Sequence, residues 1–107
     1  MRGSLNNIHP ALMANLTKLE HHVGYQLVVT SGYRDAAHNV VVGGVSNSEH
    51  TYPLAEGVDL RCTNGMKRFE LVVAALEEGF VRIGIGKTFV HLGMAKDKPQ
   101  RVMWHYY

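Results

Sequence analysis

The chain has 107 residues, of which 46% are hydrophobic and 19% are charged, and its formal net charge is +2. This composition is typical of one folded domain and excludes a disordered tail, while no apolar run approaches the roughly 18 residues that span a bilayer. Lys and Arg are not concentrated in any stretch, so we expect no nucleic-acid partner and no membrane partner. The single Cys62 excludes an internal disulfide and a multi-cysteine zinc site.

The first part of the chain predicts a short leader, a helix and a strand. Residues 1–7 lack the apolar core of a signal peptide, and we interpret them as a leader or a disordered segment of the single domain 1–107. A helix is predicted over residues 10–23, because Pro10 suits its first turn, Gly24 suits its end, and apolar residues recur at helical spacing (Leu12, Leu16, Leu19, Val23). Residues 25–31 are rich in β-branched residues and predict a strand.

The middle of the chain predicts a loop, a short helix and a second strand. A loop and a short helix are expected over residues 32–44, and residues 44–53 have loop composition. In the strand predicted over residues 55–62, alternation places Gly57, Asp59 and Arg61 on one face. Val58, Leu60 and Cys62 then face the core.

The last part predicts one long helix and three strands. The helix covers residues 63–79, begins at Thr63 or Asn64, ends at Gly79 and should bury one apolar stripe (Phe69, Val72, Val73, Leu76). Strands 81–85 and 88–94 form a hairpin whose Gly86-Lys87 loop fits a type II′ turn, and residues 101–107 form a last strand. The predicted fold is α+β, with a small, mainly antiparallel sheet, two main helices and one short helix.

Three residues suggest a metal site. Asp59 is a carboxylate inside an apolar strand, where it needs a cation nearby, and His91 lies in the middle of another strand. His50 lies on the loop that leads into the Asp59 strand, so the three side chains can converge on one ion. The spacing leaves alternatives open, because a strand histidine is often a packed core residue and Asp59 can pair with Arg34 or Arg61.

Several blocks of sequence resemble one family. VTSGYRDAAHNVVVGG, SNSEH, GVDLRC, GFVRIGIGKTFVHLGM and KPQRVMWHYY occur in this order from about Ile8 to the C-terminus. Together they resemble the zinc D-Ala-D-Ala carboxypeptidases of the hedgehog/DD-peptidase fold, and especially the small phage and bacterial members. The resemblance implies that His50, Asp59 and His91 bind one Zn²⁺ per chain.

The resemblance also implies two residues near the substrate. Arg34 matches an arginine that binds the substrate or its polarised carbonyl, and the alternative is a structural partner for Asp35 or Asp59. Ser48 matches a serine near the substrate, and it can equally be a loop residue that ties down the backbone.

This sequence departs from the family pattern in its spacer and in its general base. The spacer between His50 and Asp59 has eight residues where six are usual, and the extra residues in TYPL should reshape the rim of the site. Relatives carry a carboxylate three residues before the last histidine or two residues after it, where this chain has Thr88 and Gly93. The general base is therefore unassigned, with Glu49, Glu56 and His105 as weaker candidates.

These features predict a zinc metallopeptidase that hydrolyses peptidoglycan stem peptides by attack of zinc-bound water. The alternative is a catalytically impaired zinc module that binds wall peptides, and a third interpretation has no metal and pairs Asp59 with arginine. We expect a monomer whose partner is the wall peptide. The sequence does not indicate a location, although a phage-encoded or cytosolically made protein that is released at lysis is consistent with the lack of a signal peptide.

Overall fold

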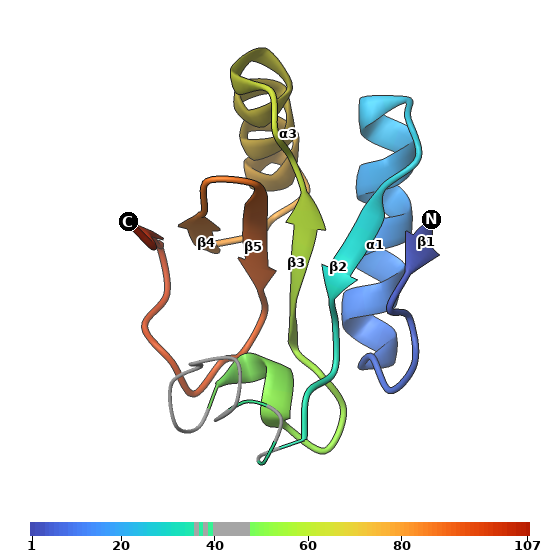
Figure 1. Cartoon of the computed structure of the whole chain (residues 1–107), viewed down its shortest axis with the longest axis vertical. Helices are drawn as coiled ribbons and strands as arrows, with labels where there is room; N and C mark the ends of the chain where they lie inside the picture. Colours follow the sequence, from blue (N-terminus) through green and yellow to red (C-terminus); the bar gives the residue numbers. More distant parts are fainter. Residues whose placement is uncertain (36, 38, 40–47) are drawn as a thin grey trace.

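The computed structural model of this chain describes residues 1–35, 37, 39 and 48–107. Within them, a six-stranded sheet packs against two helices, which confirms the α+β prediction. Figure 1 shows that both helices lie behind one face of the sheet, while the opposite face is turned toward the viewer. The elements in chain order are β1 (Arg2–Gly3), α1 (Pro10–Val23), β2 (Val28–Ser31), the 3₁₀ turn η1 (Glu49–Thr51), β3 (Gly57–Arg61), α3 (Gly65–Glu77), β4 (Arg82–Ile85), β5 (Phe89–Gly93) and β6 (Val102–His105).

The sheet has the strand order β1-β2-β3-β5-β4-β6. The three central pairings, β2–β3, β3–β5 and β5–β4, are antiparallel, and the two outer pairings, β1–β2 and β4–β6, are parallel. The sheet is therefore mainly antiparallel, as the sequence predicts. Strands β3 and β5 lie at its centre, where neighbours on both sides hold them in a fixed register.

Helix α1 and strand β3 follow their sequence patterns. Helix α1 has the predicted bounds, its leucines are fully buried (Leu12, Leu16, Leu19), and Gly24 ends it in the left-handed conformation with φ +78°. On β3, Val58 and Leu60 are buried in the core beneath the helices, so Asp59 must point to the opposite face of the sheet. Alternation along one short strand therefore turns a carboxylate away from the core.

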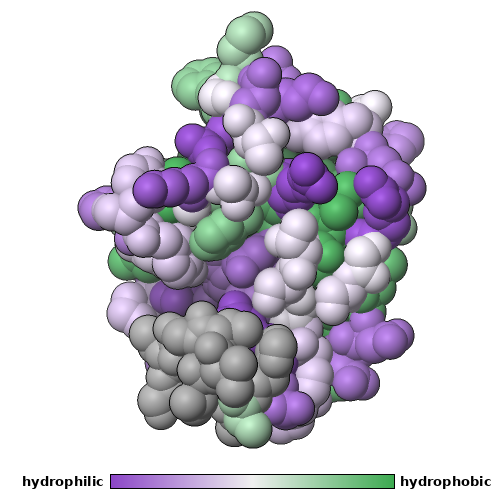
Figure 2. Space-filling view, viewed as in Figure 1, coloured by the Kyte–Doolittle hydropathy of each residue, from purple (hydrophilic) through white to green (hydrophobic). Residues whose placement is uncertain are grey.

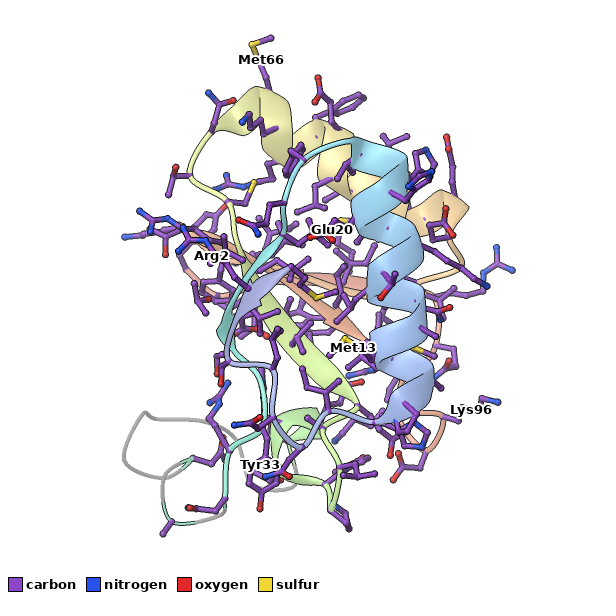
Figure 3. The ribbon with its side chains drawn as sticks, turned by 90° about the vertical axis from the view of Figure 1, so that its right-hand side faces the viewer. Arg2, Met13, Glu20, Tyr33, Met66 and Lys96 are labelled. Atoms are coloured by element: carbon purple, nitrogen blue, oxygen red, sulfur yellow. The ribbon has the colours of Figure 1, made fainter. Side chains whose placement is uncertain are left out.

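Helix α3 corrects one prediction. Asn64 caps its first turn as expected, but the stripe predicted to be buried is mostly exposed: Phe69 is 72% exposed, Leu76 is 52% exposed and Val73 is 37% exposed. The buried residues are instead Leu71, Ala74 and Ala75, with Val72 partly buried beside them. Figure 3 shows Met66 extending away from the body at the start of this helix. The core face therefore carries one large side chain and two alanines, while Phe69 and Leu76 lie on the solvent side.

The β4–β5 hairpin forms as predicted, but its turn differs. Ile85 pairs with Val90, and the Gly86 N–H donates to the Phe89 carbonyl at 2.9 Å, which centres the turn on Lys87 and Thr88. Gly86 does not adopt a positive φ, so the predicted type II′ turn at Gly86-Lys87 is wrong. A Cβ at Gly86 would overlap the ring of Phe89, which gives the glycine a steric reason instead.

The chain ends and the loop before η1 complete the description. Residues 1–7, which we interpreted as a leader or disordered segment, include strand β1, and the Met1 ammonium pairs with Glu20 at 2.7 Å. The predicted strands 25–31 and 101–107 are observed as the shorter β2 and β6. The short helix predicted within residues 32–44 falls largely outside the described residues. In the part of the chain that the structure describes, no helix is long and apolar enough to cross a membrane.

Candidate metal centre

Two of the three predicted metal ligands lie side by side at the centre of the sheet. Asp59 on β3 and His91 on β5 are direct cross-strand partners, and both project from the face opposite the helices. His50 reaches the same place from η1, which lies below the sheet in Figure 1. Figure 2 views this face and shows hydrophilic residues gathered near its middle. Two strands and one short turn thus bring together residues that are up to 41 positions apart in the sequence (His50 to His91).

The three side chains are close enough to share one ion. Asp59 Oδ1 lies 2.9 Å from His91 Nδ1 and 3.4 Å from His50 Nε2, and one potential ligand atom from each residue lies within 4.8 Å of the others. Tetrahedral zinc with ligands at about 2.1 Å separates them by about 3.4 Å, so only a small adjustment is needed. His50 and His91 are each 3% exposed, and Asp59 is 9% exposed.

The hydrogen bonds of His50 favour a cation at the cluster. His50 Nδ1 lies 2.6 Å from the Gly32 carbonyl oxygen, which can only accept, so Nδ1 must carry a proton. In the neutral imidazole, Nε2 then presents a lone pair toward Asp59 Oδ1. Two electron-rich atoms face each other in this way only when a proton or a metal ion lies between them. The donor set of two imidazoles and one carboxylate is one that zinc commonly takes.

The electrostatics of the cluster describe the metal-free protein. Burial alone would raise the pKa of Asp59, but hydrogen bonds from His50 and His91 outweigh it and lower that pKa. Burial alone would lower the pKa of His91, but hydrogen bonds to Asp59 and Glu49 outweigh it and raise that pKa. In the absence of metal, hydrogen bonds among these residues therefore join the atoms that a cation would bind.

Arg34 lies beside the cluster. Its Nη2 is 3.7 Å from Asp59 Oδ2, its Nη1 donates to Asn39 Oδ1 at 3.1 Å, and its backbone N–H donates to the His50 carbonyl at 2.8 Å. Its buried Nε has no hydrogen-bond partner among the residues that the structure describes. Arg34 thus lies beside the cluster and pairs with Asp59, as the structural alternative for this arginine proposed. Arg61, the other proposed partner of Asp59, is exposed.

Ser48 acts on the backbone of η1. Its Oγ accepts a hydrogen bond from the His50 N–H at 3.3 Å, and its carbonyl accepts bonds from the N–H and hydroxyl of Thr51. These contacts fix the turn that orients His50. The TYPL segment continues from η1, and its Tyr52 hydroxyl donates to Asp97 at 2.9 Å, which fastens the longer spacer to the loop after β5.

Glu49, which the sequence named only as a weaker candidate for the general base, contacts a predicted metal ligand directly. Its side chain is 3% exposed and its Oε1 lies 2.9 Å from His91 Nε2. Arg82 on β4 donates from Nε and Nη2 to the two oxygens, at 3.1 Å and 3.3 Å, and the Ala95 N–H donates to Oε2 at 2.9 Å. Burial alone would raise the pKa of Glu49, but the hydrogen bonds from His91, Arg82 and Ala95 lower it to about 2. Strong binding to four donors makes Glu49 a poor proton acceptor.

The other candidates for the general base lie elsewhere. His105 and Trp104 are neighbours on β6 and so face opposite sides of the sheet; the ring of Trp104 lies 5.6 Å from that of His91, and His105 therefore points away from the cluster. Thr88 is exposed at the tip of the β4–β5 hairpin, and Glu56 is half-buried before β3. Among the described residues the metal cluster contains only His50, Asp59 and His91, so the general base stays unassigned.

Aromatic side chains from the end of the chain border the cluster. The ring of Tyr106 lies 6.2 Å from Trp104 and 5.1 Å from Phe89. A Cβ at Gly84 would come within 2.7 Å of Trp104 and 2.6 Å of Tyr106, so this glycine leaves room for both rings over β4. We call Trp104, Tyr106 and Phe89 the aromatic wall. The sequence offered one signal for it, because Trp104 and Tyr106 are two residues apart on a predicted strand and so share a face.

The α+β domain carries a His–Asp–His cluster on the open face of its sheet, and zinc commonly takes this donor set in proteins. The sequence model of the family described as Peptidase M15 matches residues 2–93. The chain therefore belongs to the M15 peptidases, a zinc-dependent family of the D-Ala-D-Ala carboxypeptidase type. A search of curated proteins gave no match to this chain.

Proposed function

We propose that this protein is a zinc peptidase that hydrolyses peptidoglycan stem peptides, in the manner of a D-Ala-D-Ala carboxypeptidase. The observation that carries the proposal is the convergence of His50 and His91 on one oxygen of Asp59, in a chain that belongs to a peptidase family. His50 would bind zinc through Nε2, because its Nδ1 is committed to the Gly32 carbonyl. His91 would bind through Nδ1, the nitrogen that faces Asp59.

The site leaves a clear division of tasks. When bound, zinc supplies Lewis acid chemistry, because it polarises a peptide carbonyl and makes water nucleophilic at neutral pH. Arg34 supplies a guanidinium beside the cluster, and its planar fork suits the terminal carboxylate of a peptide or the oxyanion that develops during hydrolysis. Ser48 orients His50 through the turn, because its Oγ accepts the His50 N–H.

A second function has its own supporting observation. Among the described side chains, Asp59 is paired with both histidines and Glu49 is held by four donors, so neither carboxylate is available to take a proton from water. Loss of a general base costs about 10²–10⁴-fold in rate. A zinc module that binds wall peptides without efficient cleavage is therefore the alternative, with the same metal ligands and the same partner.

The partner and setting follow from the same proposal. A monomer of 107 residues that acts on wall peptides needs no nucleic acid and no membrane partner. Its route to the wall would be release at lysis, as for a phage-encoded or cytosolically made peptidase. Sedimentation of the purified protein tests the monomer, and binding to purified bacterial wall fragments tests the partner.

Defined muropeptides test the activity. The purified protein with one equivalent of zinc should release D-Ala from pentapeptide stems, as detected by mass spectrometry. His50→Ala should abolish both zinc binding and cleavage, whereas His21→Ala, a matched change on the exposed end of α1, should leave both intact. Intact peptides together with zinc uptake that depends on His50 would refute the enzyme and leave the binding module.

A further inference from the structure

Glu49 stands next to a proposed zinc ligand in the sequence but contacts a different one in space. The backbone of η1 turns His50 toward Asp59 and Gly32, while the Glu49 side chain crosses to β4 and β5. Four donors meet its two oxygens: Nε and Nη2 of Arg82, Nε2 of His91, and the N–H of Ala95. A carboxylate suits this position because it has only acceptors to offer.

His91 lies between two carboxylates and has one nitrogen for each. Nε2 faces Glu49 Oε1 at 2.9 Å, and Nδ1 faces Asp59 Oδ1 at 2.9 Å. A neutral imidazole carries one proton, and the carboxylate that holds it decides which nitrogen keeps a lone pair. If Glu49 holds the proton on Nε2, the lone pair of Nδ1 points toward Asp59 and His50.

We propose that Glu49 is a positioning residue of the metal centre, which keeps the proton of His91 on Nε2 and so makes Nδ1 the zinc-binding atom. The proposal rests on the proposed function for its metal. It adds a carboxylate that contacts the ligand His91 and does not itself bind the metal. Such a carboxylate fixes both the tautomer and the orientation of a histidine ligand, and its loss typically weakens metal binding about 10–100-fold.

Two glycines make room for this carboxylate. A Cβ at Gly93 would overlap both oxygens of Glu49, and a Cβ at Gly57 would lie 2.8 Å from the Glu49 Cβ and 2.8 Å from His91 Cε1. Gly93 is one of the two positions, with Thr88, where the family resemblance led us to expect a carboxylate. In this chain the space beside His91 is filled from position 49 instead, so Glu49 and a side chain at position 93 exclude each other.

Arg82 holds Glu49 in place. Its guanidinium also donates to the Pro99 carbonyl and lies over the ring of Trp104, with 5.2 Å from its central carbon to the ring centroid. The side chain is 9% exposed, so the ion pair is largely shielded from water. Arg82 therefore ties the Glu49 carboxylate to β4 and to the aromatic wall.

Glu49→Gln tests the proposal with the least change in shape. The glutamine side chain has one oxygen to accept hydrogen bonds, and its NH₂ group can only donate. In one orientation the NH₂ group faces the donors of Arg82 and Ala95, and in the other it faces His91 Nε2, so donors face each other in both. We expect a 10–100-fold higher zinc dissociation constant, measured by competition with a chromophoric chelator. Glu56→Gln removes the same charge beside β3 and should change the zinc dissociation constant less than about threefold.

The tautomer gives a readout that a purely structural role would not move. In ¹H–¹⁵N spectra of the zinc-loaded wild-type protein, His91 should carry its proton on Nε2. In the zinc-free state at high pH, where the imidazole is neutral, the same assignment should persist in the wild type and weaken or reverse in Glu49→Gln. A wild-type His91 with its proton on Nδ1 would overturn the proposal.

Gly93→Ala provides an independent test in which Glu49 itself is unchanged. Its methyl group should displace the Glu49 carboxylate and weaken zinc binding to a similar degree, and it should add little further loss to Glu49→Ala, because both act on the same contact. Folding of each variant is checked by its urea unfolding transition.

Full zinc affinity in folded Glu49→Gln and Gly93→Ala would refute the positioning role alone. A wild-type protein that binds zinc but cleaves nothing would refute the peptidase function and leave the role of Glu49 standing, and a wild type that binds no zinc would refute both.

Discussion

Gly93→Asp would restore a carboxylate to the position where the sequence led us to expect one, and the structure predicts that it damages the protein. The new Cβ would overlap both oxygens of Glu49, so the Glu49 side chain must leave Arg82 or strand β5 must move. The variant also brings a second buried negative charge to a place where one carboxylate already satisfies Arg82, Ala95 and His91.

The size of the effect follows from these two changes. Overpacking a well-packed core costs about 1–3 kcal/mol, and disrupting a buried ion pair costs about 3–5 kcal/mol. Some of the second cost is relieved if the two carboxyl groups share a proton, so we expect a net loss of about 3–5 kcal/mol. Small domains are stable by only about 5–15 kcal/mol, so this loss is a large part of the total.

Urea unfolding followed by circular dichroism measures this loss. With a slope of about 1–3 kcal/mol per molar, the midpoint for Gly93→Asp should fall by at least about 1 M in the presence of chelator. The control is Thr88→Glu, which adds a carboxylate at the exposed tip of the hairpin and should change stability by less than about 0.5 kcal/mol. Equal midpoints for the two variants would show that the Glu49 carboxylate does not fill the space beside Gly93.

Three further predictions concern substrate, pH and the core. Arg34→Gln should lower peptide cleavage about 10²-fold while zinc is still bound, as measured by steady-state kinetics and metal analysis; unchanged kinetics would remove Arg34 from the site. In the metal-free protein the pKa of His91 is raised and that of Asp59 is lowered. Thermal stability should therefore be greatest between about pH 4 and 6.5, because the His91 contribution is lost as pH rises through its folded pKa and the Asp59 contribution is lost as pH falls below its unfolded value. A flat melting profile from about pH 5 to 8 in chelator would contradict the proton-linked cluster. Leu71→Ala should cost about 2–5 kcal/mol and the exposed Phe69→Ala less than about 0.5 kcal/mol, and the reverse order in urea unfolding would contradict the observed face of α3.

The sequence predicted most of the architecture because the relevant signals are local. Pro10 and Gly24 bound α1, and the alternation of Val58, Asp59 and Leu60 is enough to turn the carboxylate away from the core. The prediction of the buried face of helix α3 was wrong because the apolar residues of this helix occupy more than one face. Their spacing alone does not reveal which face the sheet covers. The buried face carries Leu71 with two alanines, whereas the exposed face carries larger apolar residues such as Phe69 and Leu76. A count of hydrophobicity alone therefore favours the wrong face.

The sequence predicted the three metal ligands of the candidate site, but it did not predict the side-chain contacts around them. The sequence brought His50, Asp59 and His91 together through strand patterns and a family resemblance. It named Glu49 only as a weaker candidate for the general base and missed its contact with His91, because a residue beside one ligand in the sequence is not expected to reach another ligand 42 positions away. One signal was available: Gly93 lies on the same face of its strand as His91, and a missing side chain beside a ligand implies that another group fills the space.

The metal content of protein purified without chelator tests most directly whether this cluster is a zinc site. We predict one zinc per chain in the wild type and none bound specifically in Asp59→Ala, together with a rise in wild-type melting temperature when zinc is added to chelator-treated protein. Less than about 0.1 zinc per wild-type chain, with no thermal stabilisation on adding zinc, would contradict the metal centre and favour a structural pair between Asp59 and Arg34.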